Sequence, residues 1–478
     1  MIIFCSHRYS YLRVFLTLVS NLQGFILKEK FNSGLLIFLG LLILNQSSFL
    51  SADNCQRCAS SECQTDSKTF FRPRSIIEEV VFFLGLNQYN FYRRYLGPDN
   101  CFNDERVHIA VGGLFEKSNS HAKNNVGNFF FAGKPDLTEE ISDNAVESII
   151  TVRPERQVAG CYFDYHQDFC FCDGLWLDVR LALYQAVHNL NAKECGLSEV
   201  AESDCTPLNF LSSSELKFGR IPTAESKRTG FDDIEVKLGY FFKHNESGYL
   251  GIYASTLLPT ARKPTGKFLF EPLVGRGHFA LGGGFNMACN IYRSEITTLT
   301  LLTDFSYQYL FNRNELRSLD FFAGQLTRFV IANDISDSGI PVPSINVTTF
   351  NLKVAPRGVI NFWLASHLQR CKWHAEFGYN LWWRQSEKIC FPACLTPNFN
   401  NLGISEGNIF IPITLDNLDL ASTSHPRVLT NKIYLALSRD TELRCRPINI
   451  GLGGSYEFSR NINSFEQWGI WLNIVIGF

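Results

Sequence analysis

After its first 52 residues the sequence lacks any hydrophobic run long enough to form a membrane-spanning helix. Such a helix needs roughly 20 apolar residues, so a helical membrane protein is excluded. The sequence also lacks an excess of charge of one sign, because 44 Lys and Arg residues nearly balance 46 Asp and Glu residues. Without a basic surplus there is no electrostatic case for nucleic acid as a partner. Methionine is scarce, with two residues, whereas phenylalanine is abundant, with 42.

Catalytic and cofactor motifs are lacking as well. The segment 275–280 (GRGHFA) superficially matches a dinucleotide-binding fingerprint, but the residues after it alternate with period two instead of opening a helix. Asp164, His166 and Asp168 would share one face of a strand, where a metal or acid–base site is geometrically possible. A polar strand face is the commoner reason for such a pattern. We therefore predict no enzymatic activity, no cofactor and no metal.

The carboxyl-terminal residues 468–478 alternate between large apolar and mixed side chains. The apolar ones are Trp468, Ile470, Leu472, Ile474, Ile476 and Phe478. A period of two over this length predicts an extended strand with one apolar face. A buried terminal strand of a soluble β-sandwich is the alternative interpretation.

This terminal segment resembles the C-terminal assembly signal of bacterial outer-membrane β-barrels, which ends in Phe and has apolar residues at every second position before it. The resemblance implies a location in the bacterial outer membrane, with membrane lipid around the barrel. It also implies that the barrel-assembly machinery and periplasmic chaperones are partners.

The middle of the chain repeats this alternation many times. The clearest segments are 175–183, 234–242, 279–291, 299–311, 373–383 and 448–458. Strands of soluble domains average about 5–6 residues, whereas strands that cross a bilayer need roughly 9–11. Tyr, Trp and Phe near the strand ends fit the aromatic girdles of a membrane barrel. We predict an all-β fold, a transmembrane antiparallel up-and-down β-barrel over residues 106–478, with about fourteen strands and twelve as the next choice.

The predicted connections differ in length at the two ends of the barrel. Long connections are predicted on the outer face at 189–231, 259–275 and 385–430, and short periplasmic turns at 244–247, 369–370 and 441–444. This matches the short inner turns and longer outer loops of such barrels. The connection 332–345 breaks the pattern, because it is long and would be periplasmic.

The amino-terminal residues 1–105 do not resemble barrel wall. A ten-residue apolar run at 35–44 predicts a signal peptide within a presequence of residues 1–52. Residues 53–105 are Cys-rich and partly helical in pattern. They are predicted to form an extension outside the barrel or a plug within it.

Fifteen cysteines are unusual for this class, and Cys5 falls in the presequence. In an oxidising compartment structural disulfides are the default. The candidates are Cys55, Cys58, Cys63, Cys195, Cys205, Cys390 and Cys394, whose pairing the spacing leaves open. The first three lack a second ligand pair at zinc-site spacing. Cys289 is expected to face outward and stay free.

Charged residues on the predicted inward faces are the candidate functional groups. They are Asp178, Arg180, Glu235, Lys237, Asp304, Lys353, Glu376, Arg384 and Glu457. Charges of both signs on a pore wall orient polar solutes, although pairing that merely fills the interior is equally compatible. We predict a porin-like channel for small hydrophilic solutes. The alternatives are a surface-exposed outer-membrane hydrolase and a non-conducting, disulfide-stiffened structural envelope protein, and the oligomeric state stays open.

Overall fold

The computed structural model describes residues 107–478 except for 119–126, 134–145, 153, 170, 173, 197–206, 246, 270, 323–326, 335–340, 394, 396, 398, 400, 407–408, 444–445 and 460–464. The predicted presequence 1–52 and the extension or plug 53–105 lie outside the described residues and stay predictions. No helix among the described residues is long and apolar enough to cross a membrane.

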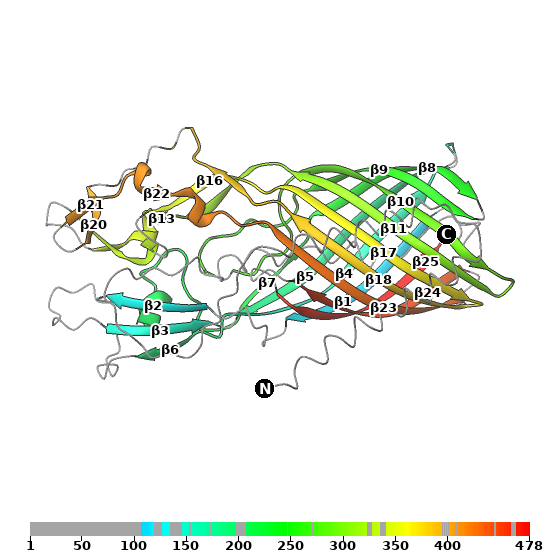
Figure 1. The fold of residues 1–478 in the computed structure, drawn as a ribbon, viewed down its shortest axis with the longest axis horizontal. Helices are drawn as coiled ribbons and strands as arrows, with labels where there is room; N and C mark the ends of the chain where they lie inside the picture. The colour runs from blue at the N-terminus through cyan, green and yellow to red at the C-terminus, as the bar shows by residue number, and fades with distance from the viewer. Residues whose placement is uncertain are drawn as a thin grey trace, which may run out of the picture. The chain divides into compact units, whose positions relative to one another are not determined.

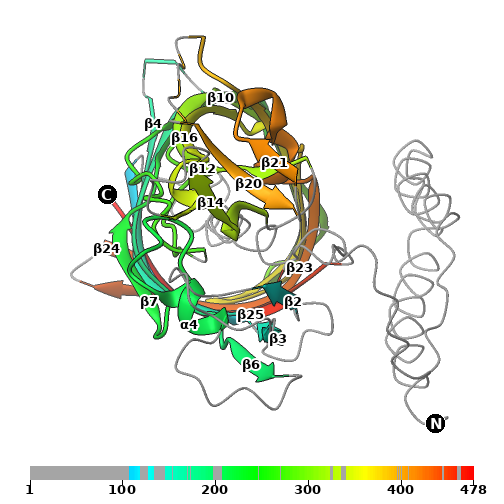
Figure 2. The ribbon, with the colours of Figure 1, turned by 90° about the vertical axis from the view of Figure 1, so that its left-hand side faces the viewer.

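Twelve of the described strands form a closed antiparallel barrel (Figures 1 and 2). They are β1 (Val107–Ser118), β4 (Glu155–Asp168), β5 (Leu175–Asn189), β8 (Ile234–Asn245), β9 (Gly248–Leu258), β10 (Ala280–Arg293), β11 (Thr297–Leu310), β17 (Arg357–Arg370), β18 (Trp373–Arg384), β23 (Val428–Leu443), β24 (Arg446–Phe458) and β25 (Gln467–Gly477). The barrel closes because β1 pairs with β4 on one side and with the last strand, β25, on the other. The predicted fold class is confirmed, and the strand number is twelve, the second of the two numbers expected.

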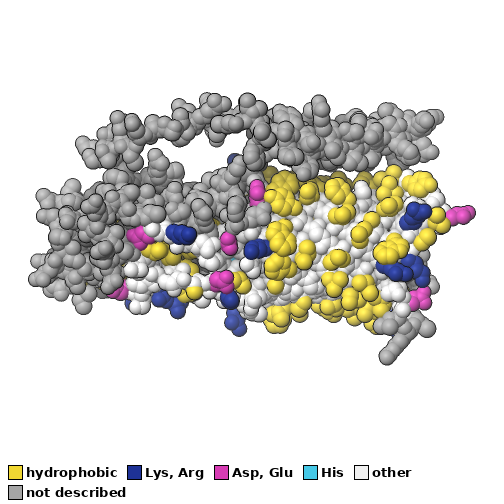
Figure 3. All heavy atoms as spheres, turned by 90° about the horizontal axis from the view of Figure 1, so that it is seen from below, with side chains coloured by type: hydrophobic (Ala, Val, Ile, Leu, Met, Phe, Trp, Pro, Cys, Tyr) yellow, Lys and Arg dark blue, Asp and Glu magenta, His cyan; other side chains and the backbone are white. Residues whose placement is uncertain are grey.

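The alternating sequence gives each wall strand an apolar outer face and a mixed inner face. On β25, Leu472 is 49% exposed, whereas its neighbours Trp471 and Asn473 are buried at 5% and 2%. The predicted assembly-signal residues thus lie on the outer face of the barrel. Figure 3 shows hydrophobic side chains over the barrel wall, with Lys, Arg, Asp and Glu gathered beyond it toward either end. An apolar exterior of this kind suits lipid rather than water.

The two ends of the barrel differ in their connections. At the short-turn end, tight connections join β8 to β9, β10 to β11, β17 to β18 and β23 to β24, and both ends of the barrel sheet, Val107 and Gly477, lie there too. At the long-loop end, longer connections carry small sheets that extend beyond the barrel (Figure 1).

Most of these small elements are short strands. The sheets are β12 (Arg313–Ser318), β16 (Thr349–Ala355) and β19 (Lys388–Cys390); β15 (Val342–Pro343), β14 (Ile331–Asp334), β20 (Leu402–Glu406) and β21 (Ile409–Pro412); β13 (Asp320–Phe321) and β22 (Leu418–Asp419); and β2 (Gly127–Gly133), β3 (Val146–Val152) and β6 (Lys193–Gly196). A thirteenth strand of the barrel sheet, β7 (Ser226–Phe231), pairs with β5. The helices are α4 (Pro207–Ser212), η1 (Thr327–Phe329), η2 (Ser344–Asn346), η3 (Leu415–Asn417) and η4 (Leu420–Thr423).

The predicted connection 332–345 belongs to the long-loop end, inside the segment that joins β11 to β17. The expectation that it would be periplasmic was wrong, because β12 and β16, which flank it, form a separate sheet and are not wall strands. β16 alternates like a wall strand, since Leu352 and Val354 are buried and Lys353 between them is exposed. Alternation alone does not tell a small sheet in a loop from a strand in the wall.

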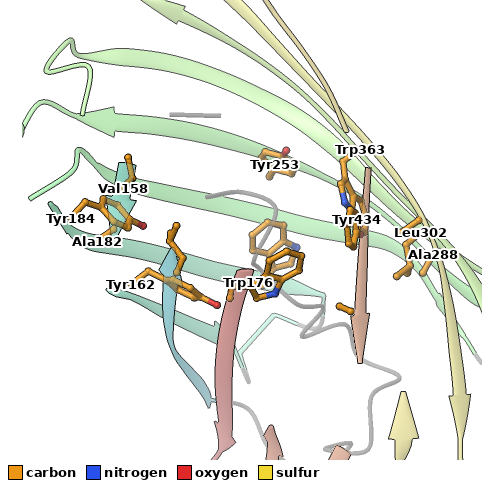
Figure 4. Close-up of a cluster of buried hydrophobic side chains, with 14 of the residues drawn as sticks. Val158, Tyr162, Trp176, Ala182, Tyr184, Tyr253, Ala288, Leu302, Trp363 and Tyr434 are labelled. Carbon is orange, nitrogen blue, oxygen red and sulfur yellow. The ribbon is translucent and has the colours of Figure 1, made fainter. Parts of the chain in front are cut away.

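Large aromatic side chains lie against glycines inside the barrel. A Cβ added at Gly239, Gly378 or Gly453 would come within 2.1–2.2 Å of the rings of Trp176, Tyr434 and Trp471 respectively. Each ring therefore occupies the space that a side chain on the neighbouring strand would need. Figure 4 shows Trp176, Trp363 and Tyr434 projecting from different strands into the interior.

Candidate channel lumen

Eight of the nine predicted inward charges lie on wall strands, and seven of those eight are buried: Asp178, Arg180, Glu235, Lys237, Glu376, Arg384 and Glu457. The eighth, Asp304, is half-buried on β11. Lys353 differs from the prediction, because it lies exposed on β16, whose partners β12 and β19 belong to the long-loop end.

One group of inward charges spans β4, β5 and β8. Arg180 Nε donates to Asp164 Oδ1 at 2.9 Å, and its Nη1 lies 3.6 Å from Glu235 Oε2. Lys237 Nζ lies 3.6 Å from the same Glu235 oxygen. Two cations and two carboxylates thus balance one another. This pairing matters because an unpaired buried charge is strongly destabilising.

Polar side chains extend this group around the wall. Gln308 Nε2 on β11 donates to Glu235 Oε1 at 3.1 Å, and Tyr253 on β9 donates its hydroxyl to Asp304 Oδ1 at 2.9 Å. The ammonium of Lys237 lies 5.1 Å from the centre of the Tyr253 ring, within the range of a cation–π interaction. Polar contacts therefore extend along the interior wall from β4 to β11, beside buried aromatic side chains of the same strands.

A second group joins β1, β23, β24 and β25 near the long-loop end. Lys432 Nζ lies 3.2 Å from Glu457 Oε2 and 3.6 Å from Glu116 Oε1, and Gln467 donates to Glu457 at 2.9 Å. Lys432 and Glu116 were not among the predicted residues. Extending the alternation of β23 backward from Tyr434 would have placed Lys432 on the inner face.

A charged cluster forms where the loops meet the barrel at the long-loop end. Glu315 on β12 accepts from Arg313 at 2.6 Å, from Arg317 at 2.7 Å and from His278 Nε2 at 2.9 Å. All these groups are at most 13% exposed. The hydrogen bond from His278, which lies in the loop that precedes β10, joins that loop to β12.

A second carboxylate, Glu387, completes this cluster from the connection between β18 and β23. It accepts from His425 and from Arg317 at 3.4 Å, and Arg384 Nη1 lies 3.7 Å away. Burial alone would raise the pKa of Glu387, but its interactions with His425 and Arg317 outweigh burial and lower this pKa to about 2. Burial lowers the pKa of His425 to about 4 against the opposing pull of Glu387. At neutral pH the imidazole is therefore neutral and the carboxylate ionised.

The glycine motif at 275–280 proves to hold a carboxylate of the chain itself. Gly275 and Gly277 have φ of 76° and 62°, which L side chains rarely adopt. The turn directs the backbone N–H groups of Arg276 and Gly277 at Asp233 Oδ2, at 2.8 and 2.7 Å. The backbone N–H groups of this turn thus hold Asp233 of the chain itself.

The carboxyl group of Asp232, next to Asp233, differs from that of Asp233 in the groups that shift its pKa. Burial, followed by the charge of Asp233, raises the pKa of Asp232 to about 8. Burial also raises the pKa of Asp233, but three backbone N–H donors oppose that rise. Three backbone N–H groups thus stabilise the ionised form of Asp233, whereas Asp232 accepts one backbone N–H, that of Asp233.

The candidate set Asp164, His166 and Asp168 is divided between two networks. Asp164 pairs with Arg180, whereas His166 Nδ1 lies 2.6 Å from Asp178 Oδ1 and its Nε2 lies 3.5 Å from Asp168. Among the described residues no group of three or more His, Cys, Asp or Glu side chains is arranged to hold a metal ion.

The predicted disulfides stay predictions. Within the described residues, free thiols are found at Cys161, Cys172, Cys289, Cys371 and Cys390. Cys289 lies partly exposed on β10. The candidates Cys55, Cys58, Cys63, Cys205 and Cys394 lie outside the described residues, as does the side chain of Cys195.

No protein-family model matches the sequence, and no curated protein matches it either. Solved structures that are similar to this chain are found. An outer-membrane channel from Pseudomonas putida F1 is similar at 11% identity and a TM-score of 0.38 over 78% of this chain and 96% of the other. The Pseudomonas putida toluene transporter TodX is 8% identical, with a TM-score of 0.32 over 78% of this chain and 88% of the other. A Pseudomonas aeruginosa FadL homologue is 8% identical, with a TM-score of 0.29 over 78% of this chain and 90% of the other.

These TM-scores all lie below 0.5, so the class of this protein rests on its own geometry. A closed antiparallel wall leaves no unpaired strand edge, and its outer face is apolar. In lipid every backbone polar group must be satisfied internally, which only helices and closed barrels achieve. The chain is a closed β-barrel with the apolar exterior of a membrane-spanning wall.

Proposed function

We propose that the protein is a channel for small hydrophilic solutes. The observation that carries this proposal is the contrast between the two faces of one wall. The outer face is apolar, whereas the inner face carries Arg180, Lys237 and Lys432 together with their carboxylate partners. A wall that only filled its interior would gain more stability from apolar side chains, since buried ion pairs are often neutral or costly.

The placement of these charges supports passage of polar solutes. The cations Arg180 and Lys237 lie on β5 and β8, and Lys432 lies on β23, on the other side of the strand order. Charges of both signs at a pore wall replace part of the hydration shell of a polar solute and orient its dipole. About eight strands suffice for side chains to fill a barrel, and twelve enclose a wider interior.

The test is single-channel recording of the full-length chain in a planar lipid bilayer. We expect discrete current steps that increase with salt concentration. The variant Arg180→Gln should change the cation-to-anion permeability ratio, because it leaves Asp164 and Glu235 without their shared cation. The matched control is Leu452→Ile on the lipid-facing side of β24, which should conduct like the unmodified protein. Silent bilayers that contain inserted protein would contradict the proposal and favour the hydrolase or structural alternatives.

A further inference from the structure

The guanidinium of Arg276 lies on the inner side of the wall, at the long-loop end of the barrel. The residue belongs to the loop between β9 and β10, and its backbone N–H donates to Asp233 Oδ2, next to the first residue of β8. Its guanidinium carbon lies 5.7 Å from the ring centre of Trp382, an inward-facing residue of β18 that is 6% exposed. In the wall, β9, β10, β11 and β17 lie between β8 and β18. A side chain that is anchored beside β8 and contacts this ring therefore lies at the mouth of the lumen.

The guanidinium of Arg276 lacks a complete set of hydrogen-bond partners. Its Nη1 is buried and has no hydrogen-bond partner among the described residues. Asp233, Asp232 and Glu235 interact with it electrostatically, but none of them accepts a hydrogen bond from Nη1. Burial has the largest effect on the pKa of Arg276 and lowers it, although a guanidinium stays charged in proteins. Since a buried cation without a hydrogen-bonded partner is costly, the site favours an anion.

The carboxylates near this guanidinium already have other donors. Asp233 accepts three backbone N–H groups. Glu235 is shared between Arg180 and Lys237. Glu387 belongs to the charged cluster described above. An anion from outside the chain is therefore the partner that fits the site. The side chain as a whole is partly exposed, so a solute can reach it.

A second guanidinium lies on the same inner face. Arg384 follows Trp382 by two positions on β18 and interacts with Arg276 as a like charge. Its Nη2 donates to Pro426 O at 3.3 Å, and its Nη1 lies 3.7 Å from Glu387 Oε1. Two cations that repel each other in a partly buried place are both stabilised by an anion bound near them.

We propose that Arg276, with Arg384 nearby, binds the carboxylate group of a small organic solute at the long-loop mouth of the lumen. This inference rests on the proposed channel function, for which it names the class of solute. A planar guanidinium can donate two parallel N–H groups to the two oxygens of a carboxylate. A single negative charge suits the site, because Asp233, Glu235 and Glu387 would repel a second one.

Saturation-transfer NMR of acetate with the full-length protein in detergent micelles tests this binding without conduction. Acetate should give a saturable signal, whereas acetamide, which has the same shape and no charge, should give none. Arg276→Gln should weaken acetate binding by about tenfold or more, because the hydrogen bonds of a charged donor are lost. The matched control Arg262→Gln removes an exposed arginine from the same loop and should bind acetate like the unmodified protein.

A second variant separates the charge of the side chain from its shape. Arg276→Gln keeps the backbone N–H that donates to Asp233, so the turn should still form. Arg276→Lys keeps the positive charge but loses the planar fork, and should bind acetate with an affinity between those of Arg276→Gln and the unmodified protein. Equal acetate binding by all these proteins would overturn the inference. Tighter binding of inorganic phosphate than of acetate would overturn the assignment to a carboxylate.

Reversal potentials in a planar bilayer connect the site with passage through the lumen. With KCl on one side and potassium acetate on the other, Arg276→Gln should lower the permeability of acetate relative to chloride several-fold, and Arg262→Gln should not. An unchanged ratio in Arg276→Gln would overturn the assignment of carboxylates as the solute class. Absence of current from a protein that binds acetate as expected would instead contradict the channel function alone.

Discussion

At the scale of single residues, the interior depends on glycines that make room for aromatic rings. Gly453 lies beneath the indole of Trp471, whereas Gly454 beside it faces lipid and has only Gly469 O, at 3.6 Å, near its added Cβ. Neither glycine has a positive φ. The two positions differ in what a side chain would meet rather than in backbone conformation.

The variant Gly453→Val should therefore destabilise the barrel. The Trp471 ring would have to move, and overpacking of this kind costs about 1–3 kcal/mol. Urea unfolding in lipid vesicles, followed by Trp fluorescence, measures the difference. Gly454→Val is the matched control and should stay within about 0.5 kcal/mol of the unmodified protein. Equal losses in both variants would show that the ring does not need this space.

Asp232 and Asp233 should respond oppositely to amide substitution. Asp233→Asn turns an acceptor of backbone N–H groups into a group that is partly a donor, which should cost about 1–3 kcal/mol. Asp232→Asn should stabilise the protein. The stability associated with the neutral Asp232 carboxyl is fully present below the ordinary carboxyl pKa and is lost as pH rises toward about 8. The advantage of the variant should grow by about 1.4 kcal/mol per pH unit up to that value. Unfolding curves from pH 5 to 9 measure it, and a pH-independent difference would contradict the ionisation argument.

At the scale of elements, period-two alternation predicted the wall strands closely. The segment 373–383 became β18 (Trp373–Arg384), and 448–458 became β24 (Arg446–Phe458). It failed in the loops, where β16 alternates as clearly as a wall strand because it also has one buried face. Lys353 was placed in the lumen for that reason.

The residues of the lumen were partly predictable from the same period-two alternation. Alternation placed Arg180 and Glu235 on the inner face, but it could not show that they contact each other, since β5 and β8 are joined through a long connection. The cluster around Glu315 and Glu387 was missed, because it depends on how separate loops meet. The contacts between these loops cannot be predicted from local sequence patterns.

The outer face of β25 should tolerate only apolar side chains. Leu472→Lys places a charge near the middle of a lipid-facing strand, which costs about 2–4 kcal/mol in membrane barrels. Yield of heat-modifiable, folded protein in the outer membrane measures assembly. Leu472→Ile is the matched control and should assemble normally. The inferred assembly signal adds that deletion of Phe478 should block insertion, and normal assembly of that variant would contradict the inference.

At the scale of the whole barrel, the two ends are chemically distinct. The short-turn end has hairpins such as 371–372, whereas the long-loop end carries the small sheets around β12 and β20. In outer-membrane barrels the short turns face the periplasm and the longer loops face outward. The assignment agrees with a periplasmic carboxyl terminus, because Gly477 lies at the short-turn end.

Protease added to intact cells should therefore cut the long-loop end first. Exposed residues in the connection between β18 and β23, such as Lys388 and Asn401, are expected sites. Exposed Lys372 in the turn between β17 and β18 should be cut only after the outer membrane is permeabilised. Mass spectrometry of the released peptides measures both, and cleavage at Lys372 in intact cells would reverse the orientation.

The pairing of β1 with β25 has a consequence for the order of events during biosynthesis. The partners His108 and Gly477 lie far apart in the sequence, so they can meet only after β25 has been synthesised. Until then the edge of β1 that will pair with β25 is open and can pair with other chains. Contacts so distant in sequence form slowly, because loop-closure entropy must be overcome first. The newly made chain therefore has to be kept apart from its own copies until its last strand arrives.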